Sequence, residues 1–307
     1  MNFLLKRKIH VLVGLSVLAI LVAALAVSIS RGGRMIFFTQ GQSTVATSTD
    51  PFLKLALEAK SVYIVDLTNN KVLFQKNPDE VLPLASLTKL VSVLVAGENL
   101  PPETAVPITE GDDNGLDPGE TWSLDKLIDF TLVTSSNDGI DAIASVAGAF
   151  FATTTTENPE QVFVDEMNKT VRSIGLSDMY FFNPSGLDVS ATTSGGYGSA
   201  KDVATLIAYI YKNYPELLSA TPAADITVSS NLIKHNVENT DEALPQIPGA
   251  IVSKTGNTDL AGGNLSVMFD AGLMHPVEIV VLDSSYDGRF TDMEALVKAT
   301  VTKLAGK

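Results

Sequence analysis

The chain has 307 residues, of which 45% are apolar and 18% are charged, so one or two globular domains with a sizeable core are expected. The net charge of −14 and the pI near 4.6 argue against nucleic acid as a partner, because phosphate binding needs clustered Lys and Arg. Cysteine is absent, which excludes a disulfide framework, a thiol nucleophile and a thiolate metal site.

Residues 1–34 are predicted to be an N-terminal membrane anchor or signal segment. A basic cluster at residues 6–8 precedes an apolar run at residues 9–29, which as a helix would span about 31 Å, one hydrocarbon core. The basic cluster predicts that the N-terminus stays inside and the rest of the chain is exported. The alternative is cleavage at the signal-peptidase-like residues 24–26, which also exports the body.

Residues 35–54 are predicted to form a flexible linker, because residues 39–50 are polar, small and uncharged until Asp50. Residues 55–307 then form one globular domain. At its start, apolar spacing predicts a short helix over 51–60. Strand-like runs at 61–67 and 71–75, separated by a Thr-Asn-Asn turn, predict a hairpin.

Helical periodicity dominates the middle of the domain and strand patterns its end. Helices are predicted at residues 85–96, 123–133, 144–151, 161–175 and 201–218. Strands follow at 226–230, 250–256, 263–270 and 277–283, and a helix at 294–305 closes the chain. The order predicts an α+β fold, in which strands from both ends of the domain form an antiparallel sheet flanked by helices. A helical subdomain is inserted between them, with a cleft beside the sheet.

Several kinds of active site are poorly supported. Histidine occurs only at positions 10, 235 and 275, and no H-E-x-x-H or G-x-S-x-G motif is present, which argues against a Ser-His-Asp hydrolase. His235 and His275 are expected to be surface or loop residues. The acidic stretch at residues 110–120 lacks the EF-hand spacing. No metal and no cofactor are therefore predicted.

Ser86 and Lys89 form an S-x-x-K motif at the start of an apolar helix. Positions three apart share a helix face, so the ammonium can reach the hydroxyl, and a serine in the first turn lies at the positive helix end. A lysine acts as a general base only when burial or a second cation lowers its pKa. The motif alone is not specific, because Ser123 and Lys126 match it equally well as an N-cap and an exposed helix residue.

Two further motifs accompany the first. Ser135 and Asn137 lie two residues apart in a tight turn, where a hydroxyl and a carboxamide can face one cleft. Lys254, Thr255 and Gly256 end an apolar strand. They would supply positive potential, a hydroxyl, and a position without a side chain where substrate backbone must approach.

Each motif is weak alone. Residues 229–231 repeat the Ser-Ser-Asn sequence in a strand-to-turn context, and Lys-Thr-Gly is compatible with an ordinary strand end. In this order and at these intervals, the three motifs form a signature of class A β-lactamases and penicillin-binding proteins.

The chain resembles the serine-type D-Ala-D-Ala carboxypeptidases, the low-molecular-mass penicillin-binding proteins, beyond these motifs. The similar segments are residues 62–90, 119–145, 181–188 and 253–269, and the resemblance runs from about residue 55 to the C-terminus. It implies a β-lactamase/transpeptidase-like fold. It also implies that peptidoglycan stem peptides are the substrate and that β-lactam antibiotics are covalent inhibitors.

The resemblance implies a role for each motif residue. Ser86 attacks the carbonyl of the terminal D-Ala-D-Ala bond, Lys89 takes its proton, and Ser135 relays a proton toward the departing D-alanine. Asn137 hydrogen-bonds the peptide.

The resemblance also assigns the strand motif and the oxyanion hole. Lys254 sets the local field and, with Thr255 beside Gly256, receives the substrate carboxylate. The backbone N–H groups of Ser86 and Asn257 would form the oxyanion hole.

The sequence departs from the family pattern in a few places. Residue 185 is Ser where His is frequent, and residue 139 is Gly where Ala is common. Many members carry a second, β-rich domain and a C-terminal amphipathic anchor, whereas this chain has an apolar N-terminal segment and ends soon after its last predicted helix.

Three alternatives to the carboxypeptidase stay open. A D,D-endopeptidase shares the acyl-enzyme and is not separated by the sequence. A class A β-lactamase needs a deacylating Glu in a loop, and none of the glutamates between Ser135 and Lys254 fits that loop pattern. A non-catalytic penicillin-binding module would be expected to have lost part of the motif set, which is complete here.

Overall fold

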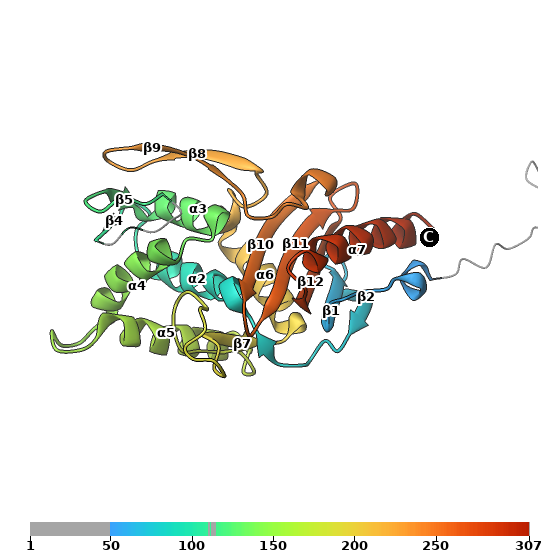
Figure 1. Cartoon of the computed structure of the whole chain (residues 1–307), viewed down its shortest axis with the longest axis horizontal. Helices are drawn as coiled ribbons and strands as arrows, with labels where there is room; N and C mark the ends of the chain where they lie inside the picture. The colour runs from blue at the N-terminus through green and yellow to red at the C-terminus, as the bar shows by residue number, and fades with distance from the viewer. Residues whose placement is uncertain (1–49, 110, 112–114, 307) are drawn as a thin grey trace, which may run out of the picture. The chain divides into compact units, whose positions relative to one another are not determined.

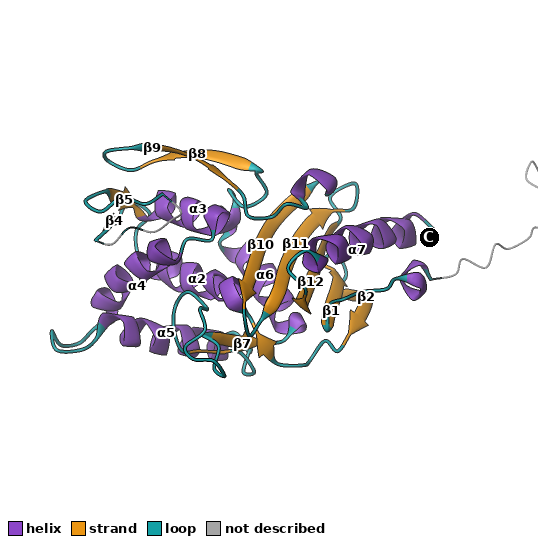
Figure 2. Ribbon diagram, viewed as in Figure 1, coloured by secondary structure: helices purple, strands orange, loops and turns teal. Residues whose placement is uncertain are grey.

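The computed structural model describes residues 50–109, 111 and 115–306. Its central element is a five-stranded antiparallel sheet in the order β10-β11-β12-β1-β2 (Figures 1 and 2). The strands are β10 (Ala250–Thr258), β11 (Gly262–Asp270), β12 (Pro276–Ser284), β1 (Ser61–Asp66) and β2 (Lys71–Lys76). Strands from the two ends of the domain therefore pair in one sheet, as the sequence predicted.

The helices between β2 and β10 form the inserted region. They are α2 (Lys89–Asn99), α3 (Leu124–Thr134), α4 (Asn137–Phe151), α5 (Pro159–Ser173) and α6 (Ala200–Asn213), and α7 (Gly288–Ala305) follows the last strand. In Figure 1, α2 to α5 gather beside the sheet, whereas α6 contacts β1 and β12. The predicted α+β architecture with an inserted helical subdomain is confirmed.

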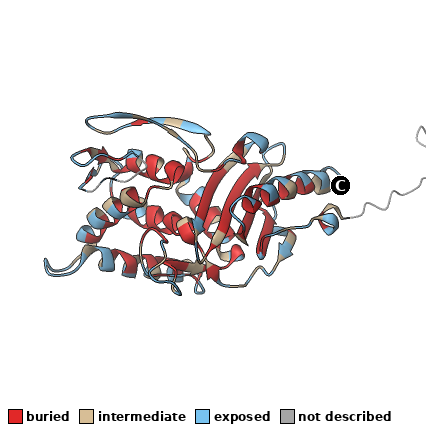
Figure 3. Ribbon diagram, in the orientation of Figure 1, coloured by how far each residue is buried: buried red, intermediate tan, exposed pale blue. Residues whose placement is uncertain are grey.

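Both faces of the sheet are buried (Figure 3). On one face, Val277, Ile279 and Val281 of β12 share an apolar cluster with Met293 and Leu296 of α7. Val280 and Leu282 of β12 face the other side of the sheet, where they share an apolar cluster with the inserted helices, α6 included. This two-residue alternation explains why β12 has a continuous apolar sequence.

Outside the central sheet, the described residues form three small sheets, and of their strands only the one near residues 226–230 was predicted. They are β3 (Leu82–Pro83), β7 (Gly196–Gly198) and β6 (Tyr180–Phe181); β4 (Ala105–Pro107) with β5 (Thr121–Ser123); and β8 (Asp225–Ser229) with β9 (Lys234–Glu238). Strands of two or three residues carry too little periodicity to be found in a sequence. The β8–β9 hairpin runs along α3 (Figure 1).

The predicted helix over residues 51–60 is wrong beyond its first turn. Pro51–Lys54 form a 3-10 helix, η1, and the following residues are irregular. The Asp292 carboxylate of α7 accepts hydrogen bonds from the N–H groups of Glu58 (3.2 Å) and Ala59 (2.7 Å). These tertiary contacts engage amide groups that a longer helix would need for its own ladder.

Other helix boundaries also differ from the prediction, the largest shift being at α4, which begins at Asn137 and not at residue 144. The helix expected over 201–218 is divided into α6 and a 3-10 helix, η3 (Pro215–Leu218). Pro215 has no N–H and disfavours the α conformation of Tyr214, so the helix ends there. The final helix begins earlier than predicted, at Gly288.

None of the helices within residues 50–109 and 115–306 has the length and apolar character needed to cross a membrane. The predicted span at residues 9–29, and most of the predicted linker, lie outside the described residues.

Glu278 is a fully buried carboxylic acid in the middle of β12. Its cross-strand neighbours are Val65 and Met268, both members of the apolar cluster beneath α6. The Ser266 hydroxyl donates to its Oε1 at 2.5 Å, and its Oε2 has no partner among the described residues. Burial raises the pKa of Glu278 to about 8, so the acid is neutral at pH 7.

The free energy of unfolding should depend on pH through Glu278. Glu278 loses its proton near pH 4.5 in the unfolded chain and near pH 8 in the folded protein. Its contribution to the free energy of unfolding is therefore fully present below pH 4.5 and is lost as the pH rises toward 8. Glu278→Gln, which stays neutral, should reduce the slope of the unfolding free energy against pH by up to about 1.4 kcal/mol per pH unit. Urea unfolding of both proteins between about pH 5 and 8 measures the slopes, and parallel slopes would contradict the assignment.

Candidate active site

Ser86 and Lys89 meet in one turn of 3-10 helix. Ser86 lies in η2 (Ala85–Thr88), and Lys89 is the first residue of α2. A 3-10 helix has three residues per turn, so side chains three apart lie directly above one another. Lys89 Nζ donates to Ser86 Oγ at 2.8 Å, and the Lys89 side chain is fully buried. The predicted approach of ammonium to hydroxyl is therefore present.

The turn before Ser86 is strained and tightly enclosed. Ala85 has a left-handed φ of 47°, which costs a residue with a Cβ about 1 kcal/mol or more. The Leu84 N–H donates to the Gly196 carbonyl at 2.9 Å. A Cβ on Gly256 would lie 2.9 Å from the Leu84 carbonyl oxygen and 3.1 Å from the Ser86 nitrogen. Gly256 is thus needed for the close approach of β10 to the Ser86 turn.

Ser135 and Asn137 lie at the junction of α3 and α4. Ser135 ends α3 with a left-handed φ of 61°, and Asn137 begins α4. Between them, the Ser136 hydroxyl caps α4 by accepting from the Gly139 N–H at 3.0 Å. Asn137 Oδ1 accepts from Lys89 Nζ at 2.8 Å. The turn therefore places the Asn137 side chain against Lys89, with Ser135 two residues before it.

Lys254 approaches the same cleft from the sheet. It lies on β10, pairs with Ser266 of β11 and is buried. Its Nζ donates to Ser135 Oγ at 2.8 Å and to the Thr255 carbonyl at 2.9 Å. The cleft thus holds two lysine–serine contacts, Lys89 with Ser86 and Lys254 with Ser135, and Asn137 bonds to the first lysine.

Two lysine side chains in one buried site disfavour each other's charge. The pKa of Lys254 is held well below its usual value, first by burial and then by the positive charges of Lys89 and Arg289. The Asp241 carboxylate acts in the opposite direction. An ammonium that loses its proton at this site becomes able to accept one.

Ser185 and Asn257 complete the immediate surroundings. The Ser185 carbonyl accepts from Lys89 Nζ at 3.0 Å. Because this contact uses the backbone, the replacement of the frequent His by Ser leaves it in place. Asn257 follows Gly256 on β10, pairs with Gly263 and is exposed.

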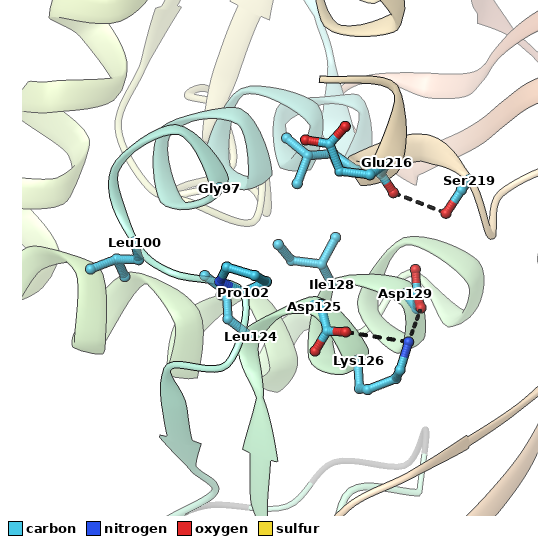
Figure 4. A pocket seen from close by; sticks show the side chains of 11 residues that line it. Gly97, Leu100, Pro102, Leu124, Asp125, Lys126, Ile128, Asp129, Glu216 and Ser219 are labelled. Carbon is cyan, nitrogen blue, oxygen red and sulfur yellow. Dashed lines mark hydrogen bonds and ion pairs between the residues drawn. The ribbon is translucent and has the colours of Figure 1, made fainter. Parts of the chain in front are cut away.

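The second S-x-x-K pair is arranged differently. The Ser123 hydroxyl donates to the Asp125 carboxylate. Lys126 forms ion pairs with Asp125 (3.3 Å) and Asp129 (3.4 Å), as Figure 4 shows. The Lys126 side chain is 48% exposed. Ser123 occupies the N-cap position of α3, as predicted, although its hydroxyl does not bond to the helix backbone.

The repeated Ser-Ser-Asn sequence and the two histidines of the domain also lie outside the Ser86 site. Asn231 Oδ1 accepts from the Thr121 N–H at 2.7 Å and so fastens the tip of the β8–β9 hairpin. His235 was expected on the surface or in a loop, but it lies on β9 with its side chain against the Trp122 ring. Buried Glu120 bonds both rings, to Trp122 Nε1 at 2.7 Å and to His235 Nε2 at 3.1 Å. His275 lies in the β11–β12 turn near Asp66.

The sequence pattern of the D-alanyl-D-alanine carboxypeptidase family matches residues 44–285. The chain belongs to this family. A family relative, D-alanyl-D-alanine carboxypeptidase DacF of Bacillus subtilis, is 31% identical over 74% of this chain and 58% of its own length. A D-alanyl-D-alanine endopeptidase of Pseudomonas aeruginosa is 28% identical over 78% of this chain and 75% of its own length. The chain thus spans little more than half of the first of these relatives.

A solved structure supports the predicted fold. Penicillin-binding protein D2 of Listeria monocytogenes, in an ampicillin-bound form, is 26% identical and superposes with a TM-score of 0.67. The match covers 80% of this chain and 98% of that one. The expected β-lactamase/transpeptidase-like fold is therefore confirmed.

Arg289 is a member of the site that the sequence did not reveal. It lies in the first turn of α7, and its Nη1 donates to the Gly256 carbonyl at 2.9 Å. The guanidinium packs over the rings of Tyr286 (4.4 Å) and Phe290 (4.5 Å). A buried cation therefore lies behind the Lys-Thr-Gly strand of this family member. Only its aromatic neighbours in the sequence hint at such a role, and they have no diagnostic spacing.

Gly186 is expected to be essential to the shape of the Ser86 turn. It has a left-handed φ of 81°, and an added Cβ would lie 1.9 Å from the Ala85 carbonyl oxygen. Gly186→Ala should lower the free energy of unfolding by more than about 2 kcal/mol, because the conformational cost and the backbone clash add.

Gly175 provides the matched control. Its φ of 85° is nearly the same, but a Cβ there would meet nothing within 4 Å. Gly175→Ala should lose only about 1 kcal/mol. Urea unfolding of the two variants measures the difference, and equal losses would show that the contact with Ala85 does not matter.

Proposed function

We propose that this chain is an extracytoplasmic serine D-Ala-D-Ala carboxypeptidase. It would remove the terminal D-alanine from peptidoglycan stem peptides through an acyl-enzyme on Ser86. The observation that carries the proposal is the pair of 2.8 Å contacts from lysine to serine, Lys89 to Ser86 and Lys254 to Ser135, in one cleft. Membership of the D-alanyl-D-alanine carboxypeptidase family supports the same substrate class.

Acylation begins with neutral Lys89. Its Nζ accepts the Ser86 proton while Ser86 Oγ forms a bond to the carbonyl carbon between the two D-alanines. The carbonyl oxygen becomes an oxyanion, for which the N–H groups of Ser86 and Asn257 are the proposed donors. Asn137, already bonded to Lys89, would orient the peptide next to the nucleophile.

Breakdown of this intermediate needs a proton on the departing amine. Ser135 is proposed to donate its hydroxyl proton to the D-alanine nitrogen as the C–N bond breaks, and to regain the proton that Lys89 took from Ser86, which leaves Lys89 neutral again. The 2.8 Å contact from Lys254 would position the Ser135 hydroxyl. Neutral Lys89 then takes a proton from the water that attacks the ester and gives it to Ser86 Oγ as the ester bond breaks, which releases the shortened peptide and restores the Ser86 hydroxyl. Lys254 and Thr255 are proposed to hold the carboxylate of the substrate in the first half-reaction.

β-Lactam antibiotics are proposed to acylate the same serine. The related penicillin-binding protein D2 binds ampicillin, which supports this expectation. No glutamate fits the deacylating loop pattern of class A β-lactamases, so the adduct should be long-lived.

A D,D-endopeptidase is the second candidate. The P. aeruginosa endopeptidase is matched over a larger share of its length, 75%, than the B. subtilis carboxypeptidase, 58%. The two activities share the acyl-enzyme and differ in the leaving group, which is a single D-alanine or a longer cross-linked peptide. Release of D-alanine from a pentapeptide, compared with cleavage of a cross-linked dimer, separates them.

Membrane attachment through residues 9–29 is also proposed, on the basic cluster and the apolar length of the sequence alone. Fractionation of cells that produce the full chain, with an antibody to the catalytic domain, tests it. Recovery of a shortened protein from the non-membrane fraction would favour cleavage instead.

Penicillin acylation tests the assigned nucleophile and base directly. Intact-mass spectrometry should find one penicilloyl adduct on the wild-type protein and none on Ser86→Ala. The adduct on Lys89→Ala should form at least about 100-fold more slowly, because the general base is lost.

The second S-x-x-K pair supplies matched controls. Ser123→Ala and Lys126→Ala make the same chemical changes at the same spacing, and both should acylate at the wild-type rate. Unchanged acylation of Lys89→Ala would remove Lys89 from its role, and an adduct on Ser86→Ala would remove Ser86.

A further inference from the structure

In the segment after β9, Thr240 contacts both α3 and β10. The Thr240 N–H donates to the Val133 carbonyl at 3.1 Å, two residues before Ser135. The Thr240 hydroxyl lies 2.6 Å from the Thr255 hydroxyl on β10. Thr240 is half-buried, and Thr255 is almost fully buried. One residue therefore links the end of α3, which presents Ser135, to the strand that presents Thr255.

The neighbours of Thr240 hold it in place. On one side, Asn239 Nδ2 donates to the carbonyls of Thr221 (2.8 Å) and Ala223 (2.9 Å). On the other side, Asp241 Oδ2 accepts from the Ser253 hydroxyl at 2.6 Å, next to Lys254. These bonds on both sides of Thr240 hold its hydroxyl beside that of Thr255.

Only one of the two hydroxyl protons can lie between Thr240 and Thr255. If Thr240 donates, the Thr255 proton is free to point into the cleft, and Thr255 offers a donor to the substrate. If Thr255 donates, it offers only acceptor lone pairs. A carboxylate has acceptors alone and selects the first arrangement, whereas a group that ends in N–H is compatible with the second.

We propose that Thr240 is a positioning residue that makes the site selective for substrates ending in a free carboxylate. It would donate to Thr255 and so direct the Thr255 proton at the substrate. The inference rests on the proposed function and concerns the same cleft.

The test compares two soluble peptides that end in D-Ala-D-Ala, one with a free carboxylate and one with a C-terminal amide. For the wild-type protein, kcat/KM should be higher for the free acid. Thr240→Val keeps the shape and the backbone N–H but lacks the hydroxyl, so the acid-to-amide ratio should fall roughly 10-fold, mainly through a higher KM for the acid. Thr240→Ser, which restores the hydroxyl, should restore the ratio. Thr240→Ala gives the same measurement if the valine variant fails to fold.

Thr227→Val is the matched control. Thr227 lies on β8 of the same hairpin, and its exposed hydroxyl bonds to Asn236 at 2.7 Å. The acid-to-amide ratio of kcat/KM for Thr227→Val should equal that of the wild type. A ratio that stays unchanged in Thr240→Val, or equal losses on the acid and the amide, would overturn the inference while leaving the proposed function intact. A wild-type protein that releases no D-alanine would overturn the proposed function itself.

Discussion

Lys89 and Lys254 bring two ammonium groups into one cleft, and neither side chain has more than a trace of contact with bulk water. Such an arrangement is unfavourable for both charges, which is why the pKa of Lys254 is lowered so far. Each lysine is compensated by hydrogen bonds, Lys89 to Ser86, Asn137 and the Ser185 carbonyl, and Lys254 to Ser135 and the Thr255 carbonyl. These hydrogen bonds offset part of the cost of burying the two lysines, and they also place each lysine Nζ against a serine hydroxyl.

The fold places these groups by joining distant parts of the chain at one edge of the sheet. β10 carries Lys254, while η2, just before α2, carries Ser86 and the α3–α4 junction carries Ser135. Left-handed conformations at Ala85 and Ser135 flank the reacting positions. Such strain persists only where surrounding contacts fix the backbone, here through Gly186, Gly256 and the Ser136 cap. Arg289 and Thr240 add contacts to the strand from α7 and from the hairpin segment.

Much of this site could be predicted from the sequence, since each motif uses local spacing. Ser86 and Lys89 are three residues apart, and Ser135 and Asn137 flank one turn, so local geometry fixes each pair. That the pairs meet came from resemblance to a family, and not from the spacing. Contacts between residues far apart in the chain leave no spacing pattern in the sequence from which they could be predicted. Arg289 reaches Gly256 from the last helix, and Asp292 holds the segment expected to be a helix at residues 51–60. The reason for Gly256 also differs from the one predicted, because its missing side chain first makes room for the Ser86 turn.

The central claim is that Lys89 and Lys254 share one buried site, so that the pKa of Lys254 lies well below the ordinary lysine value. NMR titration of the protein with 13C-labelled lysine Cε atoms tests it without reference to activity. At least one lysine signal should titrate far below the usual pKa of 10.5, disappear in Lys254→Gln, and be unaffected by Lys126→Ala. If every lysine signal titrates near 10.5, the two ammonium groups do not share a site, and the account of how Ser86 is activated is wrong.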